Sequence, residues 1–336
     1  MGRRPVFLWV MAVFVILAGV WAMRHVETTP ETGKEGYRPV PRQTQTPPVA
    51  GGYLSLYGKT YSCSHEIENY LIIGTDDSGN EEAEGDGYRG GMADFLLLVI
   101  VDKTEGSYSL LALNRDTITE VVLMQRDGSG MATADIQLCT AHWYGGNPGQ
   151  SCENTVRAVS GLLGGIPIKG YYAFSLDGVR ACNHAVGGVT VKNESDFSDI
   201  APSIKKGKTI TLADNQAVIF VQSRIGVDDG ENTSRMSRQI QYMEAFLHKA
   251  QTLGEEKAKV FLKLYRDMSS YAVTDISGKK FSRLIWRLSD SGYEGMYTFD
   301  GKTKLGKRLG DGLYHTEFIP AKKSVKKVLK EIYHLE

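Results

Sequence analysis

The stretch ADFLLLVIVDKTEGSYSLLALNRD, residues 93–116, decides the fold class. Its first apolar run, Phe95 to Val101, is followed by a charged turn at Asp102–Gly106 and by a second run from Tyr108 to Leu113. Two such runs joined by a short glycine-containing turn are typical of an antiparallel hairpin. Because both runs are almost continuously apolar, we expect two strands that are buried in the interior of a sheet.

The same kind of pattern continues along residues 52–336. Further short apolar runs predict strands at Tyr70–Ile73, Gly170–Phe174, Val189–Val191 and Ala217–Val221. Helical periodicity predicts helices at about 152–163, 176–186, 234–252, 255–265, 277–289 and 324–333. Strands interleaved with helices favour an α/β fold, and we expect one three-layer α/β/α domain around a central mixed sheet.

The N-terminal 51 residues have a different character. An apolar run from Pro5 to Met23 follows Arg3 and Arg4, and as a helix it would span about 28 Å, close to the ~30 Å core of a bilayer. The alternative is a cleaved signal peptide, but the run exceeds the ~7–15 residues of a usual signal core. We expect a cytoplasmic tail at 1–4, a single transmembrane anchor at 5–23, a proline-bearing extracytoplasmic linker at 24–51 and one domain outside the membrane at 52–336.

Composition limits the partners that this domain can have. Lys+Arg and Asp+Glu both number 39, so bulk attraction to nucleic acid is not expected and any anion site must be built locally. The four cysteines, Cys63, Cys139, Cys152 and Cys182, all follow the anchor. An even number is compatible with disulfides outside the cell in three alternative pairings, and their spacing does not resemble a zinc ligand set.

Two aspartates flank a polar loop between predicted strands. Asp76 follows the first strand, Asp94 precedes the strongest one, and the glycine-rich loop between them contains Arg89. Two carboxylates at strand edges could hold Mg²⁺ and leave positions for water and phosphate. The simpler alternative is that Asp76 caps a turn and that Asp94 starts a strand.

Arginines gather after other predicted elements. Arg115 and Asp116 end the hairpin, where they form either an internal ion pair or a fixed guanidinium for an anion, which arginine binds through two parallel hydrogen bonds. Arg224 follows the predicted strand at 217–221. Each of these arginines, taken singly, fits a structural role as well as a phosphate site.

The helix predicted at 234–252 carries two more arginines. Its expected core stripe consists of Met236, Ile240, Met243, Leu247 and Ala250. Arg235, Gln239 and Tyr242 lie along one margin of that stripe, with Arg238 just beyond. With Thr233 or Ser234 as N-cap, Arg235 falls in the first turn, where helix N–H groups favour an anion. An ordinary solvated helix face is the alternative.

In their order along the chain these segments resemble the LytR–CpsA–Psr family. The resemblance rests on Gly74-Thr75-Asp76, Ala93 to Val99, Leu113 to Thr117, Ala141 to Gly146, Gly165 to Ile168, Ala185 to Val191, Gln216 to Arg224 and Ser234 to Gln239. It covers about residues 68–252 and continues more loosely to Leu329.

Such a resemblance implies a membrane-anchored phosphotransferase that works outside the cell membrane. It implies transfer of a phosphoglycan from a polyprenyl-pyrophosphate carrier to a hydroxyl of a peptidoglycan or protein acceptor. By position it implies Mg²⁺ at Asp76 and Asp94, and a proton acceptor in Asp116 or in one of that acid pair. The implied pyrophosphate ligands are Arg89, Arg115, Arg224, Arg235, Arg238 and Gln239.

Three positions depart from the family pattern. Asn114 stands where the family usually has proline, Gln222 replaces the first arginine of an R-x-R pair, and Arg89 is five residues before Asp94 rather than two. Two other functions remain open from the sequence: a pyrophosphatase on the same lipid, with water as acceptor, and a non-catalytic receptor for polyprenyl phosphate. A pure receptor would need the arginines but would have little use for two acids that converge on a metal.

Overall fold

The structure is a computed structural model that describes residues 52–76, 90–124, 131–252, 268, 271–280, 283–284, 287 and 291–336. The expected anchor at 5–23, the linker, Arg89 and the helix expected at 255–265 lie outside these residues. In the described part of the chain, no helix is both long and apolar enough to cross a membrane. The described residues between 278 and 287 are helical, as expected for the segment 277–289.

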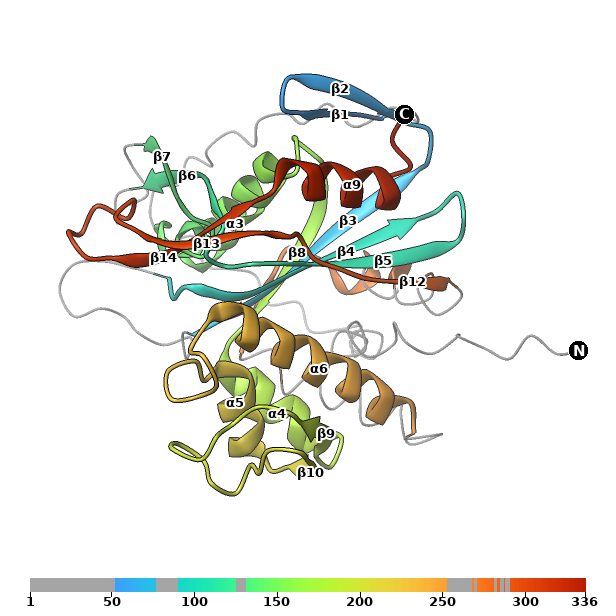
Figure 1. Ribbon diagram of the computed structural model, residues 1–336. Helices are drawn as coiled ribbons and strands as arrows, with labels where there is room; N and C mark the ends of the chain where they lie inside the picture. The colour runs from blue at the N-terminus through green and yellow to red at the C-terminus, as the bar shows by residue number, and fades with distance from the viewer. Residues whose placement is uncertain are drawn as a thin grey trace, which may run out of the picture.

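A six-stranded mixed sheet forms the centre of the domain (Figure 1). Its strands, in spatial order, are β11 (Ala272–Thr274), β8 (Ile168–Phe174), β3 (Ile67–Thr75), β4 (Ala93–Asp102), β5 (Ser107–Leu113) and β12 (Gly292–Tyr297). β3 pairs parallel with β8, β5 pairs parallel with β12, and the other pairs are antiparallel. The predicted hairpin is β4–β5, with Leu96 opposite Leu113, and the predicted mixed sheet is confirmed.

Both faces of β4 are covered, which explains its continuous apolar sequence. Because side chains alternate along a strand, Leu97 and Val99 lie on one face, and Leu96 and Leu98 lie on the other. The first pair belongs to a core shared with α4, α5 and α6, and the second pair belongs to a core shared with α3 and α9. The sheet is therefore the middle of three layers.

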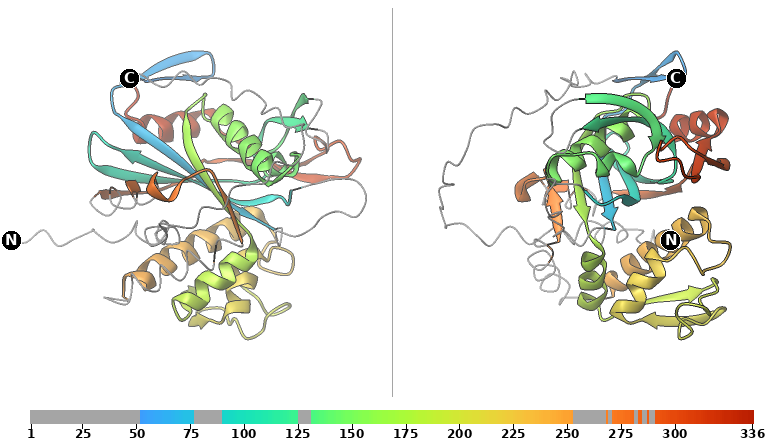
Figure 2. Two further views of the ribbon diagram at one scale, coloured as in Figure 1. Left: turned by 180° about the vertical axis from the view of Figure 1, so that it is seen from behind. Right: turned by 90° about the vertical axis from the view of Figure 1, so that its left-hand side faces the viewer.

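One outer layer contains the helices that will form part of the site. It consists of α4 (Leu176–Ala185), α5 (Asp214–Gln222), α6 (Asn232–Gln251) and a hairpin of β9 (Val189–Asn193) and β10 (Lys208–Leu212). Figures 1 and 2 show α6 lying next to the sheet, with α4, α5 and the hairpin farther out. This layer lies against the sheet near the start of β4.

The opposite layer closes the other face of the sheet. Its helices are α2 (Thr140–Trp143), α3 (Pro148–Leu162) and α9 (Lys322–Ile332). Three hairpins accompany them: β1 (Gly52–Leu56) with β2 (Lys59–Cys63), β6 (Ile118–Met124) with β7 (Met131–Gln137), and β13 (Gly301–Gly306) with β14 (His315–Pro320). β14 reaches back to the central hairpin, since the Phe318 amide donates to the Asp116 carbonyl oxygen at 2.8 Å.

Of two later strand predictions, one is wrong and one is confirmed. Residues 217–221, predicted as a strand, lie in helix α5, where Phe220 is completely buried. A short apolar run fits a buried helix as well as a strand, and the Gln216 side chain helps to start this helix by accepting the Ala213 amide at 2.9 Å. Residues 189–191 do form a strand, but β9 pairs only with β10 and lies outside the central sheet.

The expectation of disulfides has no support among the described residues. All four cysteines are described, and each is a free, buried thiol. Burial raises the pKa of Cys182 to about 12 and that of Cys139 to about 11, so both thiols stay protonated at neutral pH. Cys63, Cys152 and Cys182 belong to the two apolar cores, where a free thiol acts as a small apolar side chain.

Candidate functional site

Asp94 is the point at which the predicted site residues meet. It is the second residue of β4, and its carboxylate accepts hydrogen bonds from two guanidinium groups. Arg115, from the turn after β5, pairs with one carboxylate oxygen, and Arg235, from the first turn of α6, donates to the other at 2.7 Å. The fold thus brings together three charged side chains, with Arg115 21 residues and Arg235 141 residues after Asp94 in the chain.

The turn after β5 holds Arg115 rigidly. Its carbonyl oxygen accepts the Cys139 amide at 2.9 Å, and its Nη2 lies 3.0 Å from the Cys139 sulfur and 2.9 Å from the Met92 sulfur. Because the Cys139 thiol is neutral, it offers this guanidinium no full compensating charge.

Asp116 follows Arg115 but is more deeply enclosed. Its Oδ1 is 3.5 Å from Nε of Arg115, whereas its Oδ2 is buried and has no hydrogen-bond partner among the described residues. Burial is the main cause that raises the pKa of this carboxyl, and nearby Arg115 and Arg224 oppose the rise. An unpartnered carboxylate oxygen with a raised pKa is suited to accept a proton.

A pair of asparagines links the two arginine-bearing elements. Asn232 donates from its amide to Oδ1 of Asn114 at 2.8 Å, and its own Oδ1 accepts from Arg235 at 2.6 and 3.1 Å. Oδ1 of Asn114 also accepts the Asp116 amide at 2.9 Å. In the sequence, Asn114 stands out only as a departure from the family pattern, and Asn232 does not stand out at all. The signal that was available is the asparagine at the very start of a helix that carries the arginines.

The apolar stripe predicted for α6 packs against the core through Met236, Ile240 and Met243, but the polar margin beside it is buried more deeply than predicted. The polar margin is the more buried part, with Arg235 and Arg238 each 4% exposed and Gln239 9% exposed, whereas Met236 and Ile240 are only half-buried. The helix also begins earlier than expected, with Glu231 rather than Thr233 or Ser234 as N-cap. Polar side chains can be buried here because their partners, a carboxylate and helix-end carbonyl groups, are buried with them.

Arg238 and Gln239 serve the end of helix α5. Arg238 donates to the carbonyl oxygens of Phe220 (3.1 Å) and Ser223, and Gln239 donates to that of Val221 at 3.1 Å. These bonds satisfy carbonyl groups at the end of a helix. The Arg238 guanidinium therefore binds carbonyl groups at the end of α5 and not the Asp94 carboxylate.

Arg224 lies beyond α5 at the rim of an open pocket. That pocket is lined by Arg115, Arg235, Arg224 and Gln222, together with Ile200 and Ile225. Burial lowers the pKa of Arg235, but a guanidinium is basic enough to stay charged at any working pH. The predicted arginines 115, 224 and 235 are thus brought together, and Arg89 lies outside the described residues.

Asp76, at the end of β3, faces the same cluster from the side. One of its oxygens accepts the Met92 amide at 2.7 Å. Its pKa is raised, first by burial and then by the nearby negative charge of Asp94. Two neighbouring carboxylates, which offer oxygen ligands only, fit the ligand preference of Mg²⁺.

An apolar cavity adjoins this cluster between the sheet and the helices α4–α6. Its wall includes Phe95, Phe174, Val179, Tyr242, Met243 and Phe246. Asp94 lies at its polar end, and Gln222 borders both this cavity and the arginine-lined pocket. An apolar compartment therefore meets a cationic one, which suits a ligand with a hydrophobic tail and an anionic head.

Comparison with known proteins agrees with the family resemblance. The LytR_cpsA_psr family matches residues 32–332. A protein from Bacillus anthracis (strain CDC 684 / NRRL 3495), polyisoprenyl-teichoic acid–peptidoglycan teichoic acid transferase TagU, is 26% identical over 250 residues, which are 74% of this chain and 72% of that relative.

Solved structures share the fold. Protein gbs0355 from Streptococcus agalactiae superposes with a TM-score of 0.61 and 21% identity, covering 80% of this chain and 87% of the other. TagT bound to LI-WTA superposes with a TM-score of 0.57 and 19% identity, covering 80% and 90%.

Proposed function

This chain belongs to the LytR–CpsA–Psr family, and on that premise we propose that it transfers a phosphoglycan from a polyprenyl-pyrophosphate carrier to a hydroxyl group of peptidoglycan or of a protein. The observation that carries the proposal is the junction of the apolar cavity with the arginine-lined pocket at Asp94 and Gln222. The teichoic acid transferase activity in the name of the TagU relative supports the same reaction class. The family covers the region that contains every proposed site residue.

The two compartments divide the substrate between them. The start of the polyprenyl tail would occupy the cavity beside Phe95 and Tyr242, and the pyrophosphate would meet Arg115, Arg224 and Arg235. Guanidinium groups bind phosphate oxygens in pairs and remain charged throughout the reaction. Arg115 and Arg235 each already donate a hydrogen bond to Asp94. The phosphate would therefore share these two guanidinium groups with that carboxylate.

In the reaction, the acceptor hydroxyl oxygen forms a bond to the glycan-side phosphorus. The bond from that phosphorus to the bridging oxygen breaks, and the lipid leaves as a monophosphate. The hydroxyl proton passes to a carboxylate, for which we favour Asp116 because one of its oxygens is unpartnered, whereas both oxygens of Asp94 accept from arginine. The protein otherwise aligns the groups and neutralises charge.

Asp76 and Asp94 are the residues that would hold Mg²⁺. Bound there, the ion would supply positive charge to the phosphate oxygens during transfer. Burial and, after it, the negative charge of Asp94 raise the pKa of Asp76, and a cation beside both carboxylates would offset that charge, which supports this assignment.

We further propose that residues 5–23 anchor the chain in the cell membrane with its domain outside. A tether of this kind raises the effective concentration of the domain at a surface where its lipid substrate also lies. Nucleic acid has no part in this function.

The test uses the full-length chain in detergent with a polyprenyl-pyrophosphate glycan, peptidoglycan and Mg²⁺, and it measures lipid monophosphate and transferred glycan. We expect both products from the wild type and from Arg180→Ala, a control arginine on the outer surface of α4 that pairs with Asp177. Arg115→Ala should form neither. Lipid monophosphate without transferred glycan would identify a pyrophosphatase, binding without turnover would identify a receptor, and full activity of Arg115→Ala would contradict the site.

A further inference from the structure

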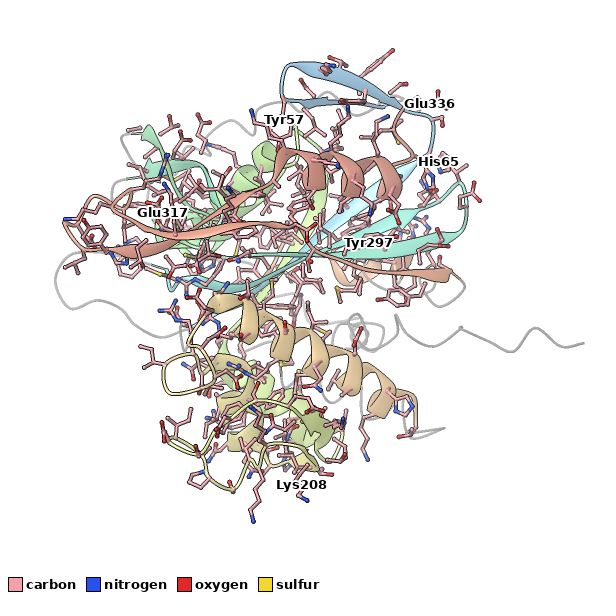
Figure 3. The ribbon with its side chains drawn as sticks, viewed as in Figure 1. Tyr57, His65, Lys208, Tyr297, Glu317 and Glu336 are labelled. Atoms are coloured by element: carbon pink, nitrogen blue, oxygen red, sulfur yellow. The ribbon has the colours of Figure 1, made fainter. Side chains whose placement is uncertain are left out.

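A second cluster of polar side chains lies at the opposite end of β4. Asp102 is the last residue of that strand, His65 lies between β2 and β3, and His334 follows α9. Eight residue steps along the strand separate Asp102 from Asp94, which is about 27 Å. Figure 3 shows His65 close to the C-terminal Glu336, on the far side of the molecule from α4 and α5.

The two histidines converge on a single oxygen atom. Nδ1 of His65 is 2.6 Å from Oδ2 of Asp102, and Nε2 of His334 is 3.3 Å from the same oxygen. The imidazole rings are stacked, with centroids 4.0 Å apart and planes 18° from parallel. All three ligand atoms lie within 4.8 Å of one another.

The backbone fixes the orientation of the carboxylate. Oδ1 of Asp102 accepts the amides of Thr104 at 2.8 Å and Glu105 at 3.0 Å. Its Oδ2 is therefore left for the two imidazoles, and Asp102 is buried apart from this contact. Hydrogen bonds to the second oxygen of a ligating carboxylate are usual in metal sites, because they hold the ligand in place.

The backbone at His334 is an independent observation. Its φ is +48°, in the left-handed region, at the position after a helix end where glycine is the common residue. The Leu335 amide returns to the Lys330 carbonyl oxygen at 3.1 Å, and the last residues pair with β2 through Ser62 and Glu336. A histidine in this conformation, with its ring on Asp102, points to a role for the imidazole itself.

We propose that His65, Asp102 and His334 form a binding site for one Zn²⁺ ion. Imidazole and carboxylate ligands suit zinc, whereas Mg²⁺ and Ca²⁺ prefer oxygen ligands alone. Ligand atoms around a tetrahedral zinc are about 3.3 Å apart, so the His334–Asp102 pair at 3.3 Å already has the required separation, and the His65–Asp102 pair at 2.6 Å must widen by roughly 0.7 Å. The His334 side chain is 45% exposed, which leaves a fourth position open to water.

The site would join three separate parts of the chain. It connects the segment that enters the central sheet, the end of β4 and the C-terminus, whose only described strand-like contact is the bridge between Leu335 and Cys63. Because the unfolded chain does not hold these ligands together, zinc binding would stabilise the folded domain.

The test uses the full-length chain without a histidine tag, stripped with a chelator, and Zn²⁺ or Co²⁺ as the probe. We expect one ion per chain by elemental analysis, a visible Co²⁺ absorption typical of mixed nitrogen and oxygen ligands, and a Zn²⁺-dependent rise in Tm of about 5 °C. His65→Ala should weaken binding at least tenfold. His315→Ala is the matched control, because His315 forms an exposed pair with Asp311 alone.

Two substitutions separate metal binding from folding. His334→Asn removes the imidazole but tolerates a positive φ, and His334→Gly removes the strain as well. We expect both variants to fold, His334→Gly to be at least as stable as the metal-free wild type, and neither to show the Zn²⁺-dependent rise. The proposal is overturned if the wild type binds no ion at micromolar concentration, if His334→Asn keeps the rise, or if His315→Ala loses it.

Discussion

Strand β4 has an aspartate near each end, and the two carboxylates have different partners. Asp94 lies between two guanidinium groups at the mouth of an apolar cavity, whereas Asp102 lies between two imidazoles beside the C-terminus. Guanidinium groups are permanently charged and bind anions, and neutral imidazoles bind metal ions. If both proposals hold, one buried strand carries two separate sites, because the partners decide what each carboxylate does.

The largest effect should come from removing Arg115, the guanidinium beside Asp94 that is proposed to bind the phosphate. We expect Arg115→Ala to lower kcat/KM for glycan transfer about 10³-fold, since a fixed donor to a phosphate oxygen is lost in a site from which water is largely excluded. Steady-state assays with the lipid-linked glycan give this value. Arg115→Lys should recover only part of the loss, because an ammonium group cannot make two parallel hydrogen bonds; a full recovery would contradict the bidentate role.

Exchanging each aspartate for asparagine compares the two ends directly. Asp94→Asn should lower transfer about 10²-fold, because Arg115 and Arg235 lose the charge that positions them. Asp102→Asn should change transfer less than twofold, since sites about 27 Å apart act independently. Equal losses in the two variants would show that the ends are coupled and would break the comparison.

The asparagine link predicts a smaller loss. Asn232→Ala should lower kcat about tenfold, because Arg235 loses two of its hydrogen bonds and Asn114 loses one. Asn232→Asp keeps the acceptor for Arg235 but not the donor to Asn114, so its kcat should lie between those of the wild type and Asn232→Ala. The kcat and KM values measured separately show whether orientation or binding is affected.

Filling the apolar cavity should affect only long substrates. Val179→Trp places a large ring in the wall of the cavity, and we expect KM for a long-chain polyprenyl substrate to rise about tenfold. The KM for a pyrophosphate with a very short chain should stay the same. An equal rise in KM for both substrates would show that the cavity does not bind the polyprenyl tail.

The smallest effect concerns the stability of the folded domain, which the buried Asp116 carboxylate lowers at neutral pH. Burial raises the pKa of its carboxyl in the folded chain, so its contribution to stability is fully present below the unfolded pKa and is lost as the pH rises through the folded value. Asp116→Asn should therefore raise Tm at neutral pH, by about 2 °C at most, and this gain should vanish in acid. Thermal unfolding at several pH values measures it, and a gain that grows in acid would contradict the sign.

The sequence allowed the centre of this fold to be predicted because its signal is local. The hairpin of residues 93–116 needs only a turn between two apolar runs, and it is confirmed as β4–β5. Helix α5 was mistaken for a strand because residues 217–221 are apolar throughout, and a run of that length has no visible period.

The site could be predicted as a set of residues but not as a geometry. Arg115, Arg235 and Asp94 were all expected, yet their shared ion pairs depend on α6 packing against the start of β4. The deep burial of Arg235 and Arg238 beside the apolar stripe of α6 was not predictable, because a hydrophobicity pattern cannot register that a distant carboxylate or carbonyl oxygen will be their partner. The pairing of Asn114 with Asn232 across 118 residues was out of reach for the same reason.

The most direct test of a substrate site formed by the apolar cavity and the arginine-lined pocket is a structure of the full-length chain with a polyprenyl pyrophosphate bound. The account predicts the pyrophosphate within hydrogen-bond distance of Arg115 and Arg235, and the first isoprene units between Phe95 and Tyr242. Pyrophosphate bound away from these arginines, or a lipid tail lying outside the cavity between the sheet and α4–α6, would contradict it.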